Sequence, residues 1–296
     1  MTPARPLAAA AWMMGAVVSF TAMAVAGREL APRLDTFEIM LYRSLIGIVV
    51  VLGAGVITNR LGEINRRDLG LHFFRNASHF AGQNLWFWAV TVITLPQLFA
   101  FEFSVPLWVA LLAPLFLAER LTLARLATAL VGFGGIMLVA RPDLGGLSPG
   151  MIAAAASALG FTFTAIATKL LTRSQTTLSI LFWLVVMQAG LGILFAGFDL
   201  DIALPDATTL PWVVLVGLAG LFAHFCITSA LQIAPAIIVY PMDFIRLPLA
   251  AAIGILFYAE PFQVSVFVGA AIVLGANLAN IVNEQRRELI RLRNMG

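Results

Sequence analysis

The chain has 296 residues, of which 61% are hydrophobic and only 11% are charged. Soluble domains average roughly half apolar and a quarter charged residues, so this composition excludes an ordinary water-soluble enzyme or binding domain. The net charge of +3 comes from basic residues spread over short connections and a tail, which does not indicate a nucleic-acid partner. A single cysteine, Cys226, excludes a disulfide framework.

The apolar residues form runs of about 20, the length that a helix needs to cross ~30 Å of hydrocarbon. Peptide groups in hydrocarbon must be hydrogen-bonded within their own segment, so each run is predicted to be a helix. The predicted spans, in chain order, are residues 7–26, 36–57, 69–91, 97–118, 123–140, 150–171, 178–197, 211–232, 236–257 and 262–282. We therefore expect an all-α integral membrane protein with ten transmembrane helices in a lipid bilayer.

The basic residues favour one orientation of these helices. If the amino terminus is cytoplasmic, twelve of the eighteen basic residues lie in inside segments and only Arg28, Arg33 and Arg141 lie in outside loops. Inside connections of membrane proteins are rich in Lys and Arg, so both termini are predicted to be cytoplasmic. We expect a multi-pass protein of a bacterial inner membrane.

The sequence repeats itself after 141 residues. One gapless shift spans all five pairs of predicted helices and matches charged positions as well as apolar ones. It superimposes Phe20 on Phe161, Arg28 on Lys169, Glu102 on Asp243, and Glu119 on Glu260. Each half holds five spans, an odd number, so the second half must cross the membrane in the opposite sense. We predict two inverted five-helix repeats, residues 1–141 and 142–283, followed by a basic cytoplasmic tail, residues 284–296.

Ionisable side chains inside a span cost several kcal/mol unless they face a partner or a polar cavity, so they are candidates for function. Counting along the spans places Arg43 and Glu102 in the outer part of the membrane, Arg75 and Asp243 in the inner part, and His79 and Arg246 near the middle. As a hypothesis for gating or proton coupling, Arg43 with Glu102 closes the outer side. Arg75 with Asp243 then closes the inner side. Alternatively, the two gating arginines reach nearby headgroups, or Asp243 is neutralised by Arg246 on its own helix.

The third predicted span carries a polar stripe, because Arg75, His79 and Gln83 recur every four residues. The stripe either lines a central cavity or bonds to a neighbouring helix as structural glue. His79 is a candidate proton carrier, since an unperturbed histidine titrates near neutral pH, or a packed histidine bonded to a neighbour. The three histidines of the chain lack an accompanying cluster of acidic ligands, so no metal site is expected.

Prolines interrupt two equivalent spans, the fourth and the ninth: Pro96, Pro106, Pro114, Pro235, Pro241 and Pro248. Proline removes a backbone donor and frees a carbonyl, which membrane helices tolerate beside a cavity, so both spans are predicted to line a path, with plain kinks as the alternative. The predicted substrate site consists of His79, Gln83, Phe101, Phe161, Phe244 and Arg246. Its aromatic members are candidate stacking walls. Arg246 favours a substrate with a carboxylate or another anionic group.

Two segments carry a family resemblance. The first half ends with PLWVALLAPLFLAERLTLARLATALVGFGGIMLVARP, residues 106–142, and the second half contains PMDFIRLPLAAAIGILFYAE, residues 241–260. These segments resemble the EamA-type branch of the drug/metabolite transporter superfamily, and the resemblance covers essentially the whole chain. It implies a ten-helix carrier of a small metabolite. An LFRN-like segment at Arg75, together with GQNLWFWA and PMDFIRLPL, is similar to the bacterial subgroup linked to uptake of S-adenosylmethionine or riboflavin.

Inverted repeats allow two halves to exchange conformations around a central site, which is typical of transporters. No glycine-rich nucleotide loop is present in the sequence, so direct use of ATP is not expected. We predict a secondary active transporter that moves a small organic metabolite, such as an anionic or zwitterionic amino acid, vitamin or nucleoside-like compound, by alternating access. We expect no enzymatic activity and no cofactor, and a membrane-embedded enzyme or a channel-like protein is the alternative. Small residues on the fifth and tenth spans predict a scaffold or a homodimer surface.

Overall fold

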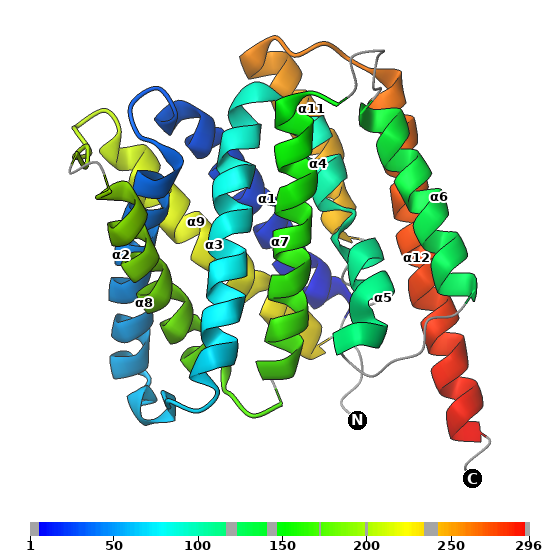
Figure 1. Cartoon of the computed structure of the whole chain (residues 1–296), viewed down its shortest axis with the longest axis horizontal. Helices are drawn as coiled ribbons and strands as arrows, with labels where there is room; N and C mark the ends of the chain where they lie inside the picture. Colours follow the sequence, from blue (N-terminus) through cyan, green and yellow to red (C-terminus); the bar gives the residue numbers. More distant parts are fainter. Residues whose placement is uncertain are drawn as a thin grey trace.

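A computed structural model describes residues 6–116, 123–140, 147–171, 173–198, 201–233 and 242–293, and the regular elements in these ranges are all helices (Figure 1). The helices pack lengthwise into one bundle, and the start of the first helix and the end of the last lie at the same end of it (Figure 1). Glu119 and the first part of the predicted ninth span fall outside the described ranges.

The α-helices of these ranges are α1 (Pro6–Leu30), α2 (Thr36–Ile57), α3 (Leu69–Val92), α4 (Leu95–Glu102), α5 (Val105–Phe116), α6 (Leu123–Ala140), α7 (Pro149–Leu171), α8 (Thr177–Ala196), α9 (Leu210–Ile233), α11 (Arg246–Tyr258) and α12 (Val264–Arg293). Short 3-10 helices, η1 (Leu61–Glu63) and η2 (Asp243–Ile245), precede α3 and α11. By length and apolar composition, α1, α2, α7, α8 and α9 are able to cross a membrane, and α4 with α5, α6, α11 and α12 contain shorter apolar helices.

Side-chain caps fix where several of these helices begin. The Asp35 carboxylate accepts from the Glu38 backbone N–H, and the Glu38 side chain accepts from the Asp35 N–H, both at 2.8 Å, so α2 starts with a capping box. Thr94 and Gln97 form the same motif at the start of α4. Each cap satisfies N–H groups that have no partner in the first turn, worth about 1 kcal/mol.

Glycines allow the long helices to pack backbone to backbone. On α7, a Cβ at Gly160 would lie 2.8 Å from the Cα of Gly82 on α3, so these two helices touch without intervening side chains (Figure 1). Gly135 of α6 meets Gly269 of α12 in the same way, and Gly15 of α1 meets Cys226 of α9. Small residues are the usual means of close helix contact where lipid removes the hydrophobic drive for association.

The predicted fourth span, residues 97–118, is two helices rather than one. Helix α4 ends at Glu102 and α5 begins at Val105, with Phe103 and Ser104 between them. Pro106 supplies the reason, because a proline has no N–H with which to continue the helical ladder. The predicted tenth span also differs, since α12 continues without a break to Arg293 and takes in most of the predicted tail.

Filling the contact between α3 and α7 will destabilise the bundle. Gly160→Ala places a methyl group against the Gly82 backbone, and overpacking of this kind costs roughly 1–3 kcal/mol. We expect a lower melting temperature for the detergent-purified protein. Gly190→Ala is the matched control, because a Cβ at Gly190 of α8 meets nothing within 4 Å. Equal melting temperatures for the two variants would contradict this packing.

Candidate functional site

Arg246 is the first residue of α11, and its side chain is 3% exposed. Its Nη1 donates to Glu102 Oε1 at 3.1 Å, and its Nη2 donates to Asp243 Oδ2 at 2.6 Å. Glu102 ends α4, so the first ion pair joins the two halves of the chain, whereas the second stays within one helical turn. Trp86 of α3 donates its Nε1–H to Glu102 Oε2 at 2.9 Å and fixes the orientation of that carboxylate.

Three phenyl rings surround the Arg246 guanidinium. Its Cζ lies 5.0 Å from the ring centroid of Phe20 on α1, 4.7 Å from that of Phe99 on α4, and 5.2 Å from that of Phe103. An arginine over an aromatic face is stabilised by the ring quadrupole, by about 2 kcal/mol or more where water is excluded. The rings therefore hold the cation while keeping lipid and water away from it.

The Arg246 cluster combines one positive and two negative charges, so its formal net charge is −1. Asp243 Oδ1 and Arg246 Nε are buried and have no hydrogen-bond partner. A buried polar group without a partner costs about 1–3 kcal/mol. The cluster is thus able to offer one carboxylate oxygen and one guanidinium N–H to a ligand.

The structure forms neither of the ion pairs hypothesised from the sequence. Glu102 and Asp243 both bond to Arg246, which leaves Arg43 and Arg75 to other surroundings. Arg43 of α2 is 8% exposed, and its Nη1 lies 3.7 Å from Met40 Sδ. Arg75 of α3 donates to the side-chain oxygens of Thr168 and Asn76 at 2.9 and 2.7 Å. The intrahelical contact of Asp243 with Arg246, the alternative from sequence, is present.

The polar stripe of α3 faces the protein interior. His79 is 3% and Gln83 4% exposed, and the His79 ring lies 5.7 Å from that of Phe161 and 6.2 Å from that of His224 on α9. Among the other predicted stacking residues, Phe101 is 3% exposed but its ring is not one of the three around Arg246. The side chain of Phe244 lies outside the described part of the structure.

A second ion pair joins the two halves at the end of the bundle opposite the termini. Arg28 Nη1 lies 2.5 Å from Glu260 Oε1, and the two side chains are 12% and 9% exposed. Arg28 also donates to the carbonyls of Val90 and Ile93, and Glu260 accepts from the Leu95 N–H with both oxygens at 3.2 Å. The pair thereby fastens the ends of α1, α3 and α11 to the start of α4.

Local backbone geometry presents Glu260 to Arg28. Ala259 ends α11 in the left-handed conformation, with φ of 51°, and the Glu260 N–H then donates to the Gly254 carbonyl at 2.9 Å. A Cβ at position 254 would meet the Glu260 carboxylate, so glycine leaves room for that side chain. Tyr258 completes the arrangement, because Arg28 Cζ lies 4.8 Å from its ring centroid.

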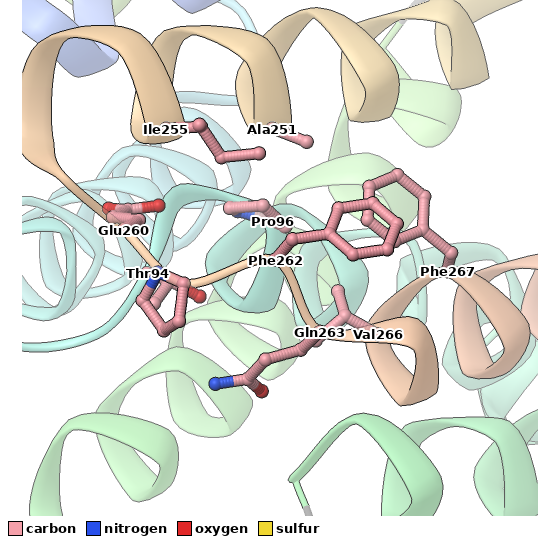
Figure 2. Close-up of a pocket in the computed structure, with 10 residues that line it drawn as sticks. Thr94, Pro96, Ala251, Ile255, Glu260, Phe262, Gln263, Val266 and Phe267 are labelled. Carbon is pink, nitrogen blue, oxygen red and sulfur yellow. The ribbon is translucent and has the colours of Figure 1, made fainter.

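Two cavities adjoin this ion pair. The larger, about 600 Å³, is lined by Arg28, Ala31, Pro32, Thr91, Val92, Ile93, Thr94, Gln97, Ser148, Met151, Tyr258 and Glu260. This volume lies in the range of small-molecule sites. The smaller, about 10 Å³, lies between α11, the start of α4 and the segment leading into α12, and Figure 2 shows Glu260 and Thr94 at one end of it and Phe262 and Phe267 at the other. It has room for about one water molecule.

Sequence reasoning missed part of these sites. Arg28 is predicted only as an outside charge, and Phe20, Phe99 and Phe103 are not among the predicted site residues. The 141-residue shift contains a usable signal, because it matches Arg28 with Lys169 and Glu260 with Glu119. Two basic residues and two acidic residues that correspond across a repeat are candidates for two equivalent ion pairs.

Apolar helices of membrane length, together with interior charges held by partners from both halves, define a multi-pass membrane protein. The chain belongs to the EamA-like transporter family of the drug/metabolite transporter superfamily. The family model matches residues 7–141, which is the first predicted repeat.

Curated relatives match almost the whole chain. A riboflavin transporter of Rhizobium johnstonii is 30% identical over 292 residues, 97% of this chain and 95% of the relative. A riboflavin transporter of Brucella anthropi is 28% identical, over 90% and 95% of the two chains. An S-adenosylmethionine uptake transporter of Rickettsia bellii is 24% identical, over 93% and 94%. These names confirm the subgroup suspected from the sequence.

The fold has also been seen in a solved structure. A crystal structure covers 95% of this chain and 98% of its own with a TM-score of 0.67, at 18% sequence identity. Identity at that level supports a shared arrangement of helices and nothing finer.

Removing Arg246 alone will destabilise the protein more than removing the whole ionic cluster. Arg246→Met leaves Glu102 and Asp243 without their cation, which costs about 3–5 kcal/mol for a buried pair. The triple variant Arg246→Met, Glu102→Gln, Asp243→Asn has no charge to compensate, so most of the lost stability should return. Melting temperatures of the two purified variants test this, and a triple variant no more stable than Arg246→Met would contradict it.

Proposed function

We propose that this chain is a secondary carrier that moves a small organic metabolite across a bacterial inner membrane by alternating access. The observation that carries the proposal is the Arg246 cluster, a charged and aromatic site in the interior of the bundle with residues from both halves. Transporters built from inverted repeats place their binding sites near the midplane, at the interface of the repeats. The family relationship supports the same class of function.

Helix positions support an internal repeat. Helices α2, α3 and α6 begin at residues 36, 69 and 123, and α8, α9 and α12 begin 141 residues later, at 177, 210 and 264. That is the shift that superimposes the two halves of the sequence. Corresponding helices therefore start at corresponding residues, as expected of two copies of one five-helix unit.

The packing of the helices supports an exchange of the two units. Helix α1 packs on α9 and, with the halves exchanged, α7 packs on α3. The pairs α2 with α8 and α6 with α12 each map onto themselves. An arrangement that is unchanged by the exchange allows each unit to adopt the conformation of the other, which gives two states of similar energy facing opposite sides.

We infer that Arg28 and Glu260 form the closed gate on the face opposite the termini. The pair joins the two halves, is nearly buried and forms part of the lining of the 600 Å³ cavity. Its counterpart in the repeat is Lys169 with Glu119, of which Glu119 lies outside the described residues. In the proposed cycle one gate opens as the other closes, with termini on the cytoplasmic side. The proposed gates therefore differ from the pairs hypothesised from the sequence, which were Arg43 with Glu102 and Arg75 with Asp243.

The relatives suggest what the substrate resembles. Both riboflavin and S-adenosylmethionine combine a flat heteroaromatic ring with a polar chain, and relatives of nearly full length carry these names. Phe20, Phe99 and Phe103 offer aromatic faces to such a ring beside the charges of the Arg246 cluster. We propose a metabolite of this size and chemistry as substrate.

Transport is tested with purified protein in liposomes that are offered labelled riboflavin or S-adenosylmethionine, with and without a proton gradient. We expect saturable flux of one compound by the wild type. In the triple variant without charges at the Arg246 cluster, the flux should fall roughly 30-fold or more, since a lost buried charged contact costs about 2–5 kcal/mol. Arg33→Gln, at an exposed ion pair, is the control. Flux in the triple variant at the wild-type rate would place the site elsewhere.

The gate is tested by labelling from the face opposite the termini with a membrane-impermeant maleimide. Cys226→Ser removes the buried native thiol, and Phe20→Cys places a reporter beside Arg246. We expect Glu260→Gln to raise the labelling rate several-fold, because the carboxylate that holds Arg28 is neutralised. Glu63→Gln, in the exposed Arg60 pair, should leave the rate unchanged. An unchanged rate in Glu260→Gln would argue against a gate at this pair.

A further inference from the structure

Four basic side chains lie on α2, α3 and α9, in the part of the bundle next to Phe20. They are Arg43 of α2, Arg75 and His79 of α3, and His224 of α9. The Phe20 ring lies 5.8 Å from that of His224, which lies 6.2 Å from that of His79. The Arg43 guanidinium lies against Gly220 of α9, one helical turn before His224, where an added Cβ would be 3.0 Å from Arg43 Nε. Arg75 lies one helical turn before His79 on α3. We call Arg43, Arg75 and His79 the cationic cluster.

No carboxylate of the described residues pairs with Arg43 or Arg75. In the described residues, carboxylates pair with Arg28, Arg33, Arg60, Arg67 and Arg246. Arg43 and Arg75, both at least nine-tenths buried, form no such pair, and their polar contacts are to neutral side chains. Two buried arginines without a carboxylate partner are costly in an apolar interior, and an anion from outside the chain would offset that cost.

Further donors near the cluster are also available. His79 Nδ1 and Gln83 Nε2 are buried and have no hydrogen-bond partner, and the two side chains lie one helical turn apart on the same face of α3. Two guanidinium groups, an imidazole and a carboxamide together present several N–H groups. Such a donor set matches the oxygens of a carboxylate or a phosphate, which arginine binds in a planar, two-pronged geometry.

The Arg246 cluster has the opposite charge balance. It holds two carboxylates around one arginine and would repel an anionic group, while its free Asp243 oxygen accepts from a cation or a neutral donor. Phe20 contacts both the Arg246 guanidinium and the ring of His224, which in turn lies 6.2 Å from the ring of His79. The interior therefore has a positive pole and a negative pole.

We propose that the cationic cluster binds the carboxylate or phosphate of the transported metabolite, while its cationic or neutral end lies at the Arg246 cluster. The substrate class is thus a metabolite with a carboxylate or a phosphate, such as a zwitterion. S-adenosylmethionine fits this class better than riboflavin, which has neither a carboxylate nor a phosphate. This rests on the proposed carrier function. It moves the anion-binding role from Arg246, where the sequence suggested it, to Arg43 and Arg75.

Anion binding is tested without any transport. The full chain is placed in phosphatidylcholine nanodiscs, so no anionic headgroup competes, and its melting temperature is followed against sodium phosphate or sodium acetate at an ionic strength fixed with sodium chloride. We expect saturable stabilisation of the wild type. Arg43→Gln and Arg75→Gln should each weaken the apparent affinity about tenfold or more. Arg33→Gln, which removes an exposed charge, should respond like the wild type.

The same variants separate a binding role from a structural one. If the cationic cluster lacks an anion, Arg43→Gln should melt at or above the wild-type temperature when no oxyanion is present. A variant that unfolds, stabilisation that persists in both variants, or no stabilisation of the wild type by either oxyanion would each overturn the proposal. Anion binding without flux would instead leave this site standing and count against the carrier function, so the two failures are distinguishable.

Discussion

The ion pairs of Arg246 join the two halves of the chain at a depth where water does not compensate a charge. Glu102 reaches this guanidinium from α4, Asp243 reaches it from the turn before α11, and three phenyl rings exclude solvent around it. Since a buried charge without its partner costs several kcal/mol, α1, α3, α4 and α11 must keep these groups together. Both clustered carboxylates lie where a helix ends or begins, Glu102 at the end of α4 and Asp243 at the start of η2.

Arg28 with Glu260 and the Arg246 cluster are both ionic links between the halves, but they differ in surroundings. Arg28 and Glu260 also bond to the backbone at the ends of α3 and the start of α4, next to a wide cavity, so their separation leaves groups that water can reach. Arg246 is enclosed by rings. In the proposed cycle the first link opens and closes, whereas the second persists until a ligand takes its place.

Apolar periodicity predicts several of the helices within the described residues but does not pair their charges. Helices α2 and α6 have the predicted bounds, 36–57 and 123–140, because a run of apolar residues with polar ends specifies a helix locally. Helical spacing offers Arg246 as a partner of Asp243, but the partner of Glu102 is not predictable in this way. Depth along a span says how far a side chain lies from the surface but not which way the helix is turned, so matching depths alone favour Arg43 over Arg246 as the partner of Glu102. The contact of the Phe20 ring with Arg246 likewise depends on which way its helix is turned about its axis.

The last helix has a practical consequence for imaging. Helix α12 has 30 residues, or about 45 Å at ~1.5 Å per residue, whereas the hydrocarbon core is ~30 Å thick. Its final turns therefore project beyond the bilayer at the carboxyl end of the chain (Figure 1). A soluble domain spliced in helical register onto Arg293 would be held by a rigid rod rather than a flexible tether. Such a fiducial would give a 31.8 kDa membrane protein the mass and the outline that single-particle alignment requires.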